Sequence, residues 1–223
     1  FYGIATLPMQ APKAAADELE RAISKLNLKG MQIGSNINGK NLDEPEFEPV
    51  WQVANEHAAF LMIHPNNVAG ADRLKNYYLN NLIGNPLDTT IALEKLIFEG
   101  VFDKYPQLKI LAAHGGGFLG SYAPRMDRSC YISPQNCNPN IVLKKKPSEY
   151  VRQIYMDALV FTPEALRHLA AEVGPGQIMV GTDHPIPWEE DPIGHIMSTP
   201  ELSDEDRLNI LGENAIRVLG LKP

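Results

Sequence analysis

The segment QIMVGTDHPIPW, residues 177–188, changes character halfway along its length. Its first residues are apolar and typical of a buried strand, and after a Gly-Thr pair the chain continues directly with Asp183 and His184. Two other apolar runs end in the same way. FLMIHPNN, residues 60–67, leads into His64, and KILAAHGGG, residues 109–117, leads into His114. We therefore expect strands whose final residues carry chemically active side chains.

Short apolar runs alternate with longer amphipathic segments along the whole chain. The apolar runs lie at residues 3–7, 31–34, 59–63, 109–113, 154–160 and 177–181, and the helix-like segments lie at 12–28, 45–58, 88–104, 163–173 and 203–219. Most runs are continuously apolar, as in a parallel sheet covered on both faces, although Asp157 interrupts one of them. The alternation predicts one α/β domain, residues 1–223, with about six β/α units.

Two architectures fit this alternation: an open doubly wound sheet and a (β/α)₈ barrel of the TIM type. Neither GxGxxG nor GxxxxGK[ST], the phosphate-binding fingerprints of the first, occurs in the chain. In a barrel the C-terminal strand ends converge on one face, where active sites are built. His64, His114 and Asp183 would meet there, and two histidines with a carboxylate form a metal-ligand set. The sequence therefore favours the barrel.

Each of these residues also has a purely structural explanation. A single histidine after a strand is more often hydrogen-bonded packing, and an aspartate before His-Pro can simply start a turn. Three such residues in the same structural position favour a site. Gly115 and the two glycines after it leave room for a ligand to approach the backbone, although such a run is also typical of a flexible turn. His57 and His168 fall inside predicted helices and His195 in a loop-like stretch, so these three are expected to be surface or helix-face residues.

Composition narrows the classes of function. The chain has 20 basic and 27 acidic residues, a formal net charge of −7, which argues against nucleic acid as a partner. No apolar run is long enough to span a bilayer and no secretory signal pattern opens the sequence, so we expect a soluble, cytoplasmic protein. Cys130 and Cys137 lack the spacing of a zinc knuckle and are predicted to be free thiols.

Three motifs together resemble a known family. MIHP, AAHGGG and GTDHPIP, in this order and with these spacings, are similar to the decarboxylase branch of the amidohydrolase superfamily, which includes aminocarboxymuconate-semialdehyde decarboxylase and γ-resorcylate decarboxylase. The likeness extends through NNLIGNPLDTTIALEKLIFEGVFDKYPQLKI, residues 80–110, and covers nearly the whole chain. It implies a (β/α)₈ barrel that binds one divalent metal, commonly zinc and in some relatives manganese.

The resemblance also implies roles for individual residues. His64 and Asp183 correspond to metal ligands from the fifth and eighth strands, and His114 corresponds to the acid/base group beside a metal-bound water. Gly115 is predicted to contact the substrate. Arg125 corresponds to an arginine that binds the substrate carboxylate of a neighbouring subunit, which implies a homo-oligomer, most simply a dimer.

One element of the family pattern is absent. No two histidines stand two residues apart, so the first-strand His-x-His or Glu-x-His motif is missing, and we expect two further β/α units, about 60 residues, before Phe1. The predicted function is a metal-dependent decarboxylase of an aromatic or unsaturated carboxylic acid. The alternatives are a hydrolase that acts on a lactone or another ring-cleavage product, and an inactive truncated remnant.

Overall fold

The central sheet consists of parallel strands that lie side by side in the order in which they occur along the chain. The computed structural model describes residues 1–221. Its main sheet contains β1 (Ala5–Thr6), β2 (Gly30–Gly34), β5 (Phe60–His64), β6 (Lys109–Ala112), β7 (Tyr155–Asp157) and β8 (Ile178–Met179), in that order. Every neighbouring pair is parallel. The predicted α/β class is confirmed, and the six sequential parallel strands form part of a TIM-type barrel.

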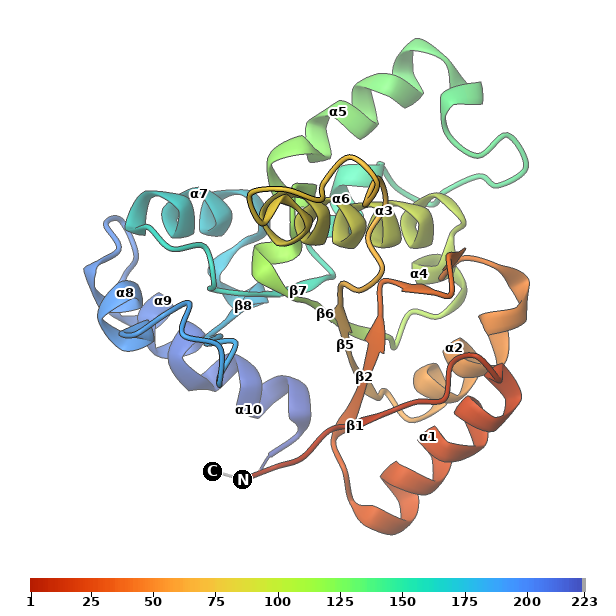
Figure 1. The fold of residues 1–223 in the computed structure, drawn as a ribbon, viewed down its shortest axis with the longest axis horizontal. Helices are drawn as coiled ribbons and strands as arrows, with labels where there is room; N and C mark the ends of the chain where they lie inside the picture. The colour runs from red at the N-terminus through yellow and green to blue at the C-terminus, as the bar shows by residue number, and fades with distance from the viewer. Residues whose placement is uncertain (222–223) are drawn as a thin grey trace.

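Helices connect the strands and surround the sheet (Figure 1). They are α1 (Pro12–Leu26), α2 (Glu48–Glu56), α3 (Asn85–Phe98), α4 (Val101–Lys104), α5 (Leu119–Ile132), α6 (Pro147–Val151), α7 (Pro163–Val173), α8 (Pro192–Ser198), α9 (Asp204–Leu208) and α10 (Asn214–Leu219). Local sequence explains several starts. The Thr162 hydroxyl accepts a hydrogen bond from the Ala165 amide at the start of α7, and Ser203 forms a capping box with Asp206 at α9. A small antiparallel pair, β3 (Asn36–Ile37) and β4 (Lys40–Asn41), follows β2.

Alternate residues of each strand face opposite sides of the sheet, and both sides are covered. Leu61, Ile63 and Ile110 are fully buried in the larger core, against the surrounding helices. Their neighbours Phe60 and Leu111 form a second cluster with Met179 of β8 and Val218 of α10. The strands therefore read as continuously apolar because both of their faces are packed.

Four of the five predicted helical segments are shorter or divided in the structure, and the fifth, 163–173, matches α7. Segment 88–104 contains α3 and α4, which are separated at Gly100, where φ is 68°. Segment 203–219 contains α9 and α10 with a wide helical turn between them, Asn209–Glu213. His195 is predicted in a loop-like stretch, but it lies in α8 and is only 9% exposed, so the predicted loop is wrong. In the described residues no helix is long and apolar enough to cross a membrane.

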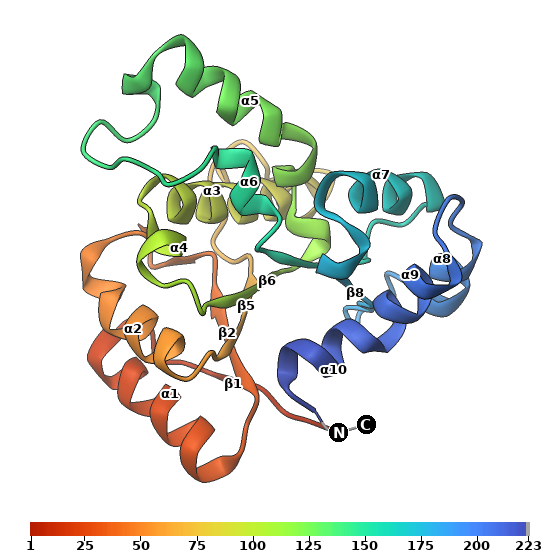
Figure 2. The same cartoon turned by 180° about the vertical axis from the view of Figure 1, so that it is seen from behind.

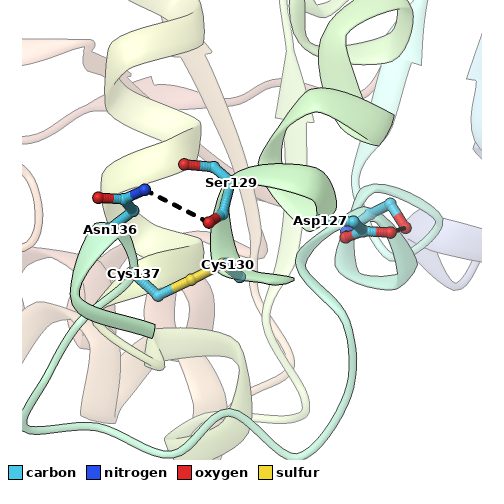
Figure 3. The surroundings of a disulfide bond; sticks show 6 residues. Asp127, Ser129, Cys130, Asn136 and Cys137 are labelled. Carbon is cyan, nitrogen blue, oxygen red and sulfur yellow. Dashed lines mark hydrogen bonds between the residues drawn. A yellow bond between two sulfur atoms is a disulfide. The ribbon is translucent and has the colours of Figure 1, made fainter. Parts of the chain in front are cut away.

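Helix α5 projects from the body of the molecule, as both orientations show (Figures 1 and 2). After it ends, the chain reverses through a short 3₁₀ turn, Pro134–Asn136, which brings Cys137 back beside Cys130 with a Cα–Cα distance of 5.4 Å. The two cysteines form a disulfide, and the Asn136 amide donates a 3.4 Å hydrogen bond to the Ser129 carbonyl next to it (Figure 3). The prediction of free thiols is therefore wrong, because the reversal after α5 places the two side chains together.

Candidate metal centre

Three side chains from three strand ends meet at one place. His64 is the last residue of β5, His114 follows β6, and Asp183 follows β8. Each offers a ligand atom, and these atoms lie within 4.8 Å of one another. The two imidazole rings have centroids 5.1 Å apart and planes inclined by 72°. Because parallel strands present their C-terminal ends to the same side, residues distant in sequence become neighbours here.

A tight left-handed turn places His114. Its φ is 58°, and Gly115, Gly116 and Gly117 follow with φ values of 63°, 72° and 65°. Only glycine adopts this region without cost, so the glycine run is required by the backbone. A Cβ at Gly115 would also lie 2.5 Å from Val160 Cγ1. His114 is not a glycine, so its left-handed conformation is strained. Strained backbone of this kind is typical of functional sites.

The buried carboxylate of Asp157 holds this turn from the neighbouring strand β7. Its oxygens accept hydrogen bonds of 2.9 Å from the His114 and Gly115 amides, and one of them accepts a 3.1 Å bond from Leu159. Three donors therefore compensate the buried negative charge. In the sequence, Asp157 stands out only as an interruption of an apolar strand. A charged residue inside such a strand is the one feature of the sequence that could have indicated this buried role.

A second buried carboxylate supports the loop after His64. Asp88 of α3 accepts hydrogen bonds from the Ser35 hydroxyl, from Asn36 Nδ2 at 2.9 Å and from the Ala69 amide at 3.0 Å. Asn36 Nδ2 also donates to the Asn66 carbonyl at 2.7 Å. The loops after β2 and β5 are thus fixed to each other and to α3, and this network positions the backbone around His64.

The segment that opened the sequence analysis ends β8 with a close approach to β7. A Cβ at Gly181 would lie 2.7 Å from the Asp157 Cβ, so only glycine fits there. Asp183 then takes a left-handed conformation with φ of 55°, and its carbonyl accepts a 2.9 Å hydrogen bond from Ile186. His184 is exposed and is not part of the cluster of ligand atoms.

The electrostatics of the cluster suit a cation. The pKa of His64 is lowered, chiefly because the side chain is partly buried and also because of the nearby charge of His114, while Asp183 opposes the shift. A lowered pKa favours the neutral imidazole, which is the form that binds metals. Two nitrogen donors and one carboxylate are a set that zinc and other divalent transition metals accept. The residues present therefore fit a divalent metal ion.

The other predicted site residues lie differently. The Gly115 amide already donates to Asp157, so this group serves the turn. Arg125 lies on α5 and lines a separate cavity of about 460 Å³ together with Glu94 and Phe118, away from the three clustered residues. Among residues 1–221 it makes no side-chain hydrogen bond or ion pair. The chain by itself does not bring Arg125 to the cluster, and its role across a subunit boundary stays a prediction.

Fold and site together define a class: a barrel-type α/β protein with a cluster of two histidines and an aspartate at its strand ends. The amidohydrolase family profile matches residues 1–221. The chain belongs to the amidohydrolase family, which confirms the resemblance found in its motifs.

Its relatives include several decarboxylases. The chain is 39% identical over 224 residues to 2-amino-3-carboxymuconate-6-semialdehyde decarboxylase of Dictyostelium discoideum, covering 100% of this chain and 62% of that protein. The crystal structure of 5-carboxyvanillate decarboxylase from Sphingomonas paucimobilis matches with a TM-score of 0.91 and 28% identity, over 100% of this chain and 67% of that one. A dihydroxybenzoic acid decarboxylase from Polaromonas sp., solved with bound manganese, matches with a TM-score of 0.86 and 26% identity, over 99% and 69%. The chain thus spans less than two thirds of the length of the first of these relatives.

Proposed function

We propose that this protein acts as a metal-dependent decarboxylase of an aromatic or unsaturated carboxylic acid. The observation that carries the proposal is the convergence of His64, His114 and Asp183 at the carboxyl ends of three parallel strands. The activities of its relatives support the reaction type, since those proteins are named as decarboxylases of ring acids and of a muconate semialdehyde. The same fold hosts many reactions, so the assignment depends on the site.

His64 and Asp183 are the residues that would hold the metal. A histidine nitrogen and a carboxylate oxygen suit zinc, and the manganese in the Polaromonas structure makes manganese the second candidate. When bound, a divalent ion supplies positive charge that polarises an oxygen of the substrate. Metal analysis of the purified protein, followed by reconstitution with each ion, distinguishes the two.

His114 is the proton donor in the proposed reaction. Its imidazolium transfers a proton to the carbon that bears the carboxylate, and the new C–H bond leaves the ring as an electron sink. The bond to the carboxylate then breaks, its electron pair returns to the ring system, and carbon dioxide leaves. His114 regains a proton from solvent. The left-handed turn and its hydrogen bonds to Asp157 keep the imidazole in position for this transfer.

Arg125 is the proposed group for a substrate carboxylate, in a homodimer in which it approaches the cluster of the second subunit. Its guanidinium is exposed and unpaired among residues 1–221, and its planar fork suits a carboxylate. Charged hydrogen bonds of this kind contribute about 1.5–3 kcal/mol, so Arg125→Ala should raise KM by roughly 10- to 100-fold. Arg128→Ala is the matched control, because Arg128 lies on the same helix and stacks on Tyr131 at 5.0 Å.

The test is an assay of carbon dioxide release by the metal-loaded protein from 2,6-dihydroxybenzoate, 5-carboxyvanillate and muconate-type acids. Release from one of these acids, sensitive to Arg125→Ala and insensitive to Arg128→Ala, supports the proposal. Ring opening of a lactone without carbon dioxide would favour the hydrolase alternative. Metal binding without turnover of any of these compounds would favour the inactive remnant.

One feature of the structure argues against the cytoplasmic location predicted from the sequence. The Cys130–Cys137 disulfide weighs against a reducing compartment, where structural disulfides are rare. Thiol trapping in intact cells measures whether the pair is oxidised there.

A further inference from the structure

Aromatic side chains from three separate loops gather beside the metal centre. Tyr78 belongs to the segment between β5 and α3, Phe161 follows β7, and Trp188 follows β8. The Tyr78 and Trp188 rings are stacked, with centroids 6.1 Å apart and planes inclined by 22°. The Phe161 ring lies 6.1 Å from Trp188 at an angle of 56°. The Trp188 indole is thus in contact with an aromatic ring from each of the other two loops.

These aromatic residues are held in unfavourable surroundings. Tyr78 and Phe161 are 60% and 54% exposed, so their rings gain little from burial. Their φ values are 59° and 67°, a region that is costly for bulky residues. His114 and Asp183 share this left-handed conformation. Backbone strain of this kind clusters at active sites and ligand-binding positions.

A small cavity connects this aromatic group to His114. It has a volume of about 110 Å³ and is lined by Asn81, Leu82, Asn85, Pro86, His114, Leu159, Phe161 and Trp188. Its size is of the same order as the roughly 150 Å³ apolar cavity that holds one benzene molecule. The walls are mostly apolar, and the two asparagine amides offer hydrogen bonds to ring substituents. The cavity therefore has the size and chemistry for one substituted ring.

We propose that Phe161 and Trp188 form the wall on which the planar ring of the substrate stacks beside His114, with Tyr78 fixing the orientation of the indole. This inference rests on the proposed function and deepens it by assigning the residues that contact the ring of the substrate. Offset stacking needs a flat π-system, so aliphatic acids lose this contact. The cavity beside His114 has a volume of only about 110 Å³, so we expect acids with two fused rings to bind more weakly.

Substitutions at Trp188 test the stacking. Trp188→Phe keeps a planar face and Trp188→Leu keeps only apolar volume, so we expect Trp188→Phe to bind 2,6-dihydroxybenzoate within about threefold of the natural protein and Trp188→Leu about tenfold more weakly. Binding is measured by calorimetry on the metal-loaded protein, and KM by carbon dioxide release. Tyr2→Ala is the control, because Tyr2 is a 59% exposed aromatic residue that precedes β1, at the opposite ends of the strands, and it should change neither value.

Ring size is tested with 1-hydroxy-2-naphthoate. The natural protein should bind this two-ring acid at least about tenfold more weakly than 2,6-dihydroxybenzoate, and Phe161→Ala should reduce that difference by enlarging the cavity. Equal binding by Trp188→Leu and Trp188→Phe, or no preference for the single ring, overturns the proposal. Stacking-dependent binding without carbon dioxide release would leave the ring wall in place and reject the decarboxylase. Carbon dioxide release that is unaffected in Trp188→Leu would support the decarboxylase and reject the ring wall.

Discussion

The strand-end cluster and the projecting helix α5 differ in how their candidate side chains are held: buried hydrogen bonds fix the first, and solvent surrounds the second. At the cluster, buried groups fix the backbone: Asp157 accepts hydrogen bonds from His114, and Asp88 holds the loop that follows His64. On α5, Arg125 is exposed and lines a cavity away from the cluster. The cluster is assembled by one chain, whereas Arg125 has no ion-pair partner among residues 1–221, and the carboxylate proposed for it belongs to a substrate bound by another subunit.

The two regions also depend on different restraints. The cluster depends on close contacts across the sheet, where a Cβ on Gly181 would meet the Asp157 side chain at 2.7 Å. The end of α5 depends on the Cys130–Cys137 disulfide and on the bond from the Ser148 hydroxyl to Asp127, 2.6 Å long. Side chains whose surroundings are fixed by packing and buried hydrogen bonds are positioned more accurately than an exposed, unpaired side chain. The difference predicts that changes at the cluster affect metal binding and changes on α5 do not.

The largest effect is expected from loss of a ligand. Asp183→Ala removes the anionic donor of the cluster, and zinc affinity should fall by more than about 100-fold, since changes to residues that merely orient ligands already cost 10- to 100-fold. Arg125→Ala should leave zinc affinity unchanged. Calorimetric titration of both variants with zinc and manganese measures this. Equal affinities of Asp183→Ala and the natural protein would show that Asp183 is not a ligand.

Asp157→Asn should affect both stability and metal binding. Asparagine keeps one acceptor oxygen but turns an amide donor toward backbone amides, which should cost about 2–3 kcal/mol. For a chain of this size the melting temperature should fall by about 4–12 °C. Because His114 loses its anchor, zinc affinity should also fall, by roughly 10-fold or more if His114 contributes to the ion's surroundings.

Asp127→Asn is the matched control for Asp157→Asn. Like Asp157, Asp127 is a carboxylate that accepts several hydrogen bonds, here two, from the Ser148 amide at 2.9 Å and from the Ser148 hydroxyl, but it lies on α5. This variant should lose stability without losing zinc affinity. If both variants weaken metal binding equally, the proposed independence of the two regions is incorrect.

Removing the disulfide should produce a smaller effect, confined to α5. A double change of Cys130 and Cys137 to Ser frees the end of this helix and should lower the free energy of unfolding by at most about 2–3 kcal/mol for so short a loop. Reduction of the natural protein should lower its melting temperature to that of the double variant. Limited proteolysis should cut near residues 133–146 first. A change in zinc affinity would contradict the expectation.

The smallest effect concerns Glu94, which shares a cavity with Arg125. Burial raises the pKa of its carboxyl group. The folded state therefore binds this proton more tightly than the unfolded state does. The contribution of Glu94 to the free energy of unfolding is fully present at low pH and is lost as pH rises through the folded pKa, because burial disfavours the ionised carboxylate. Glu94→Gln should slightly raise the melting temperature at pH 7 and leave it unchanged near pH 4. A destabilised variant at pH 7 would indicate that the carboxylate has a cationic partner.

Local pattern was sufficient for the class of fold and for the members of the cluster. The predicted helix at 163–173 has the bounds of α7, because its Thr-Pro start is encoded within a few residues. Each apolar run became a strand because apolar periodicity reports burial of consecutive residues. His64, His114 and Asp183 stand directly after such runs, so their convergence follows from the parallel order of the strands.

Other features depended on contacts between segments far apart in the chain. The disulfide formed because the chain reverses after α5, and cysteine spacing alone does not reveal a reversal. Asp157 became the anchor of His114 because strand register places β7 beside the turn after β6. The aromatic wall needs three loops to meet at Trp188. Sequence periodicity describes which side of an element is buried, whereas the partner across that buried surface is selected by strand register and loop path, which arise only when the whole sheet packs.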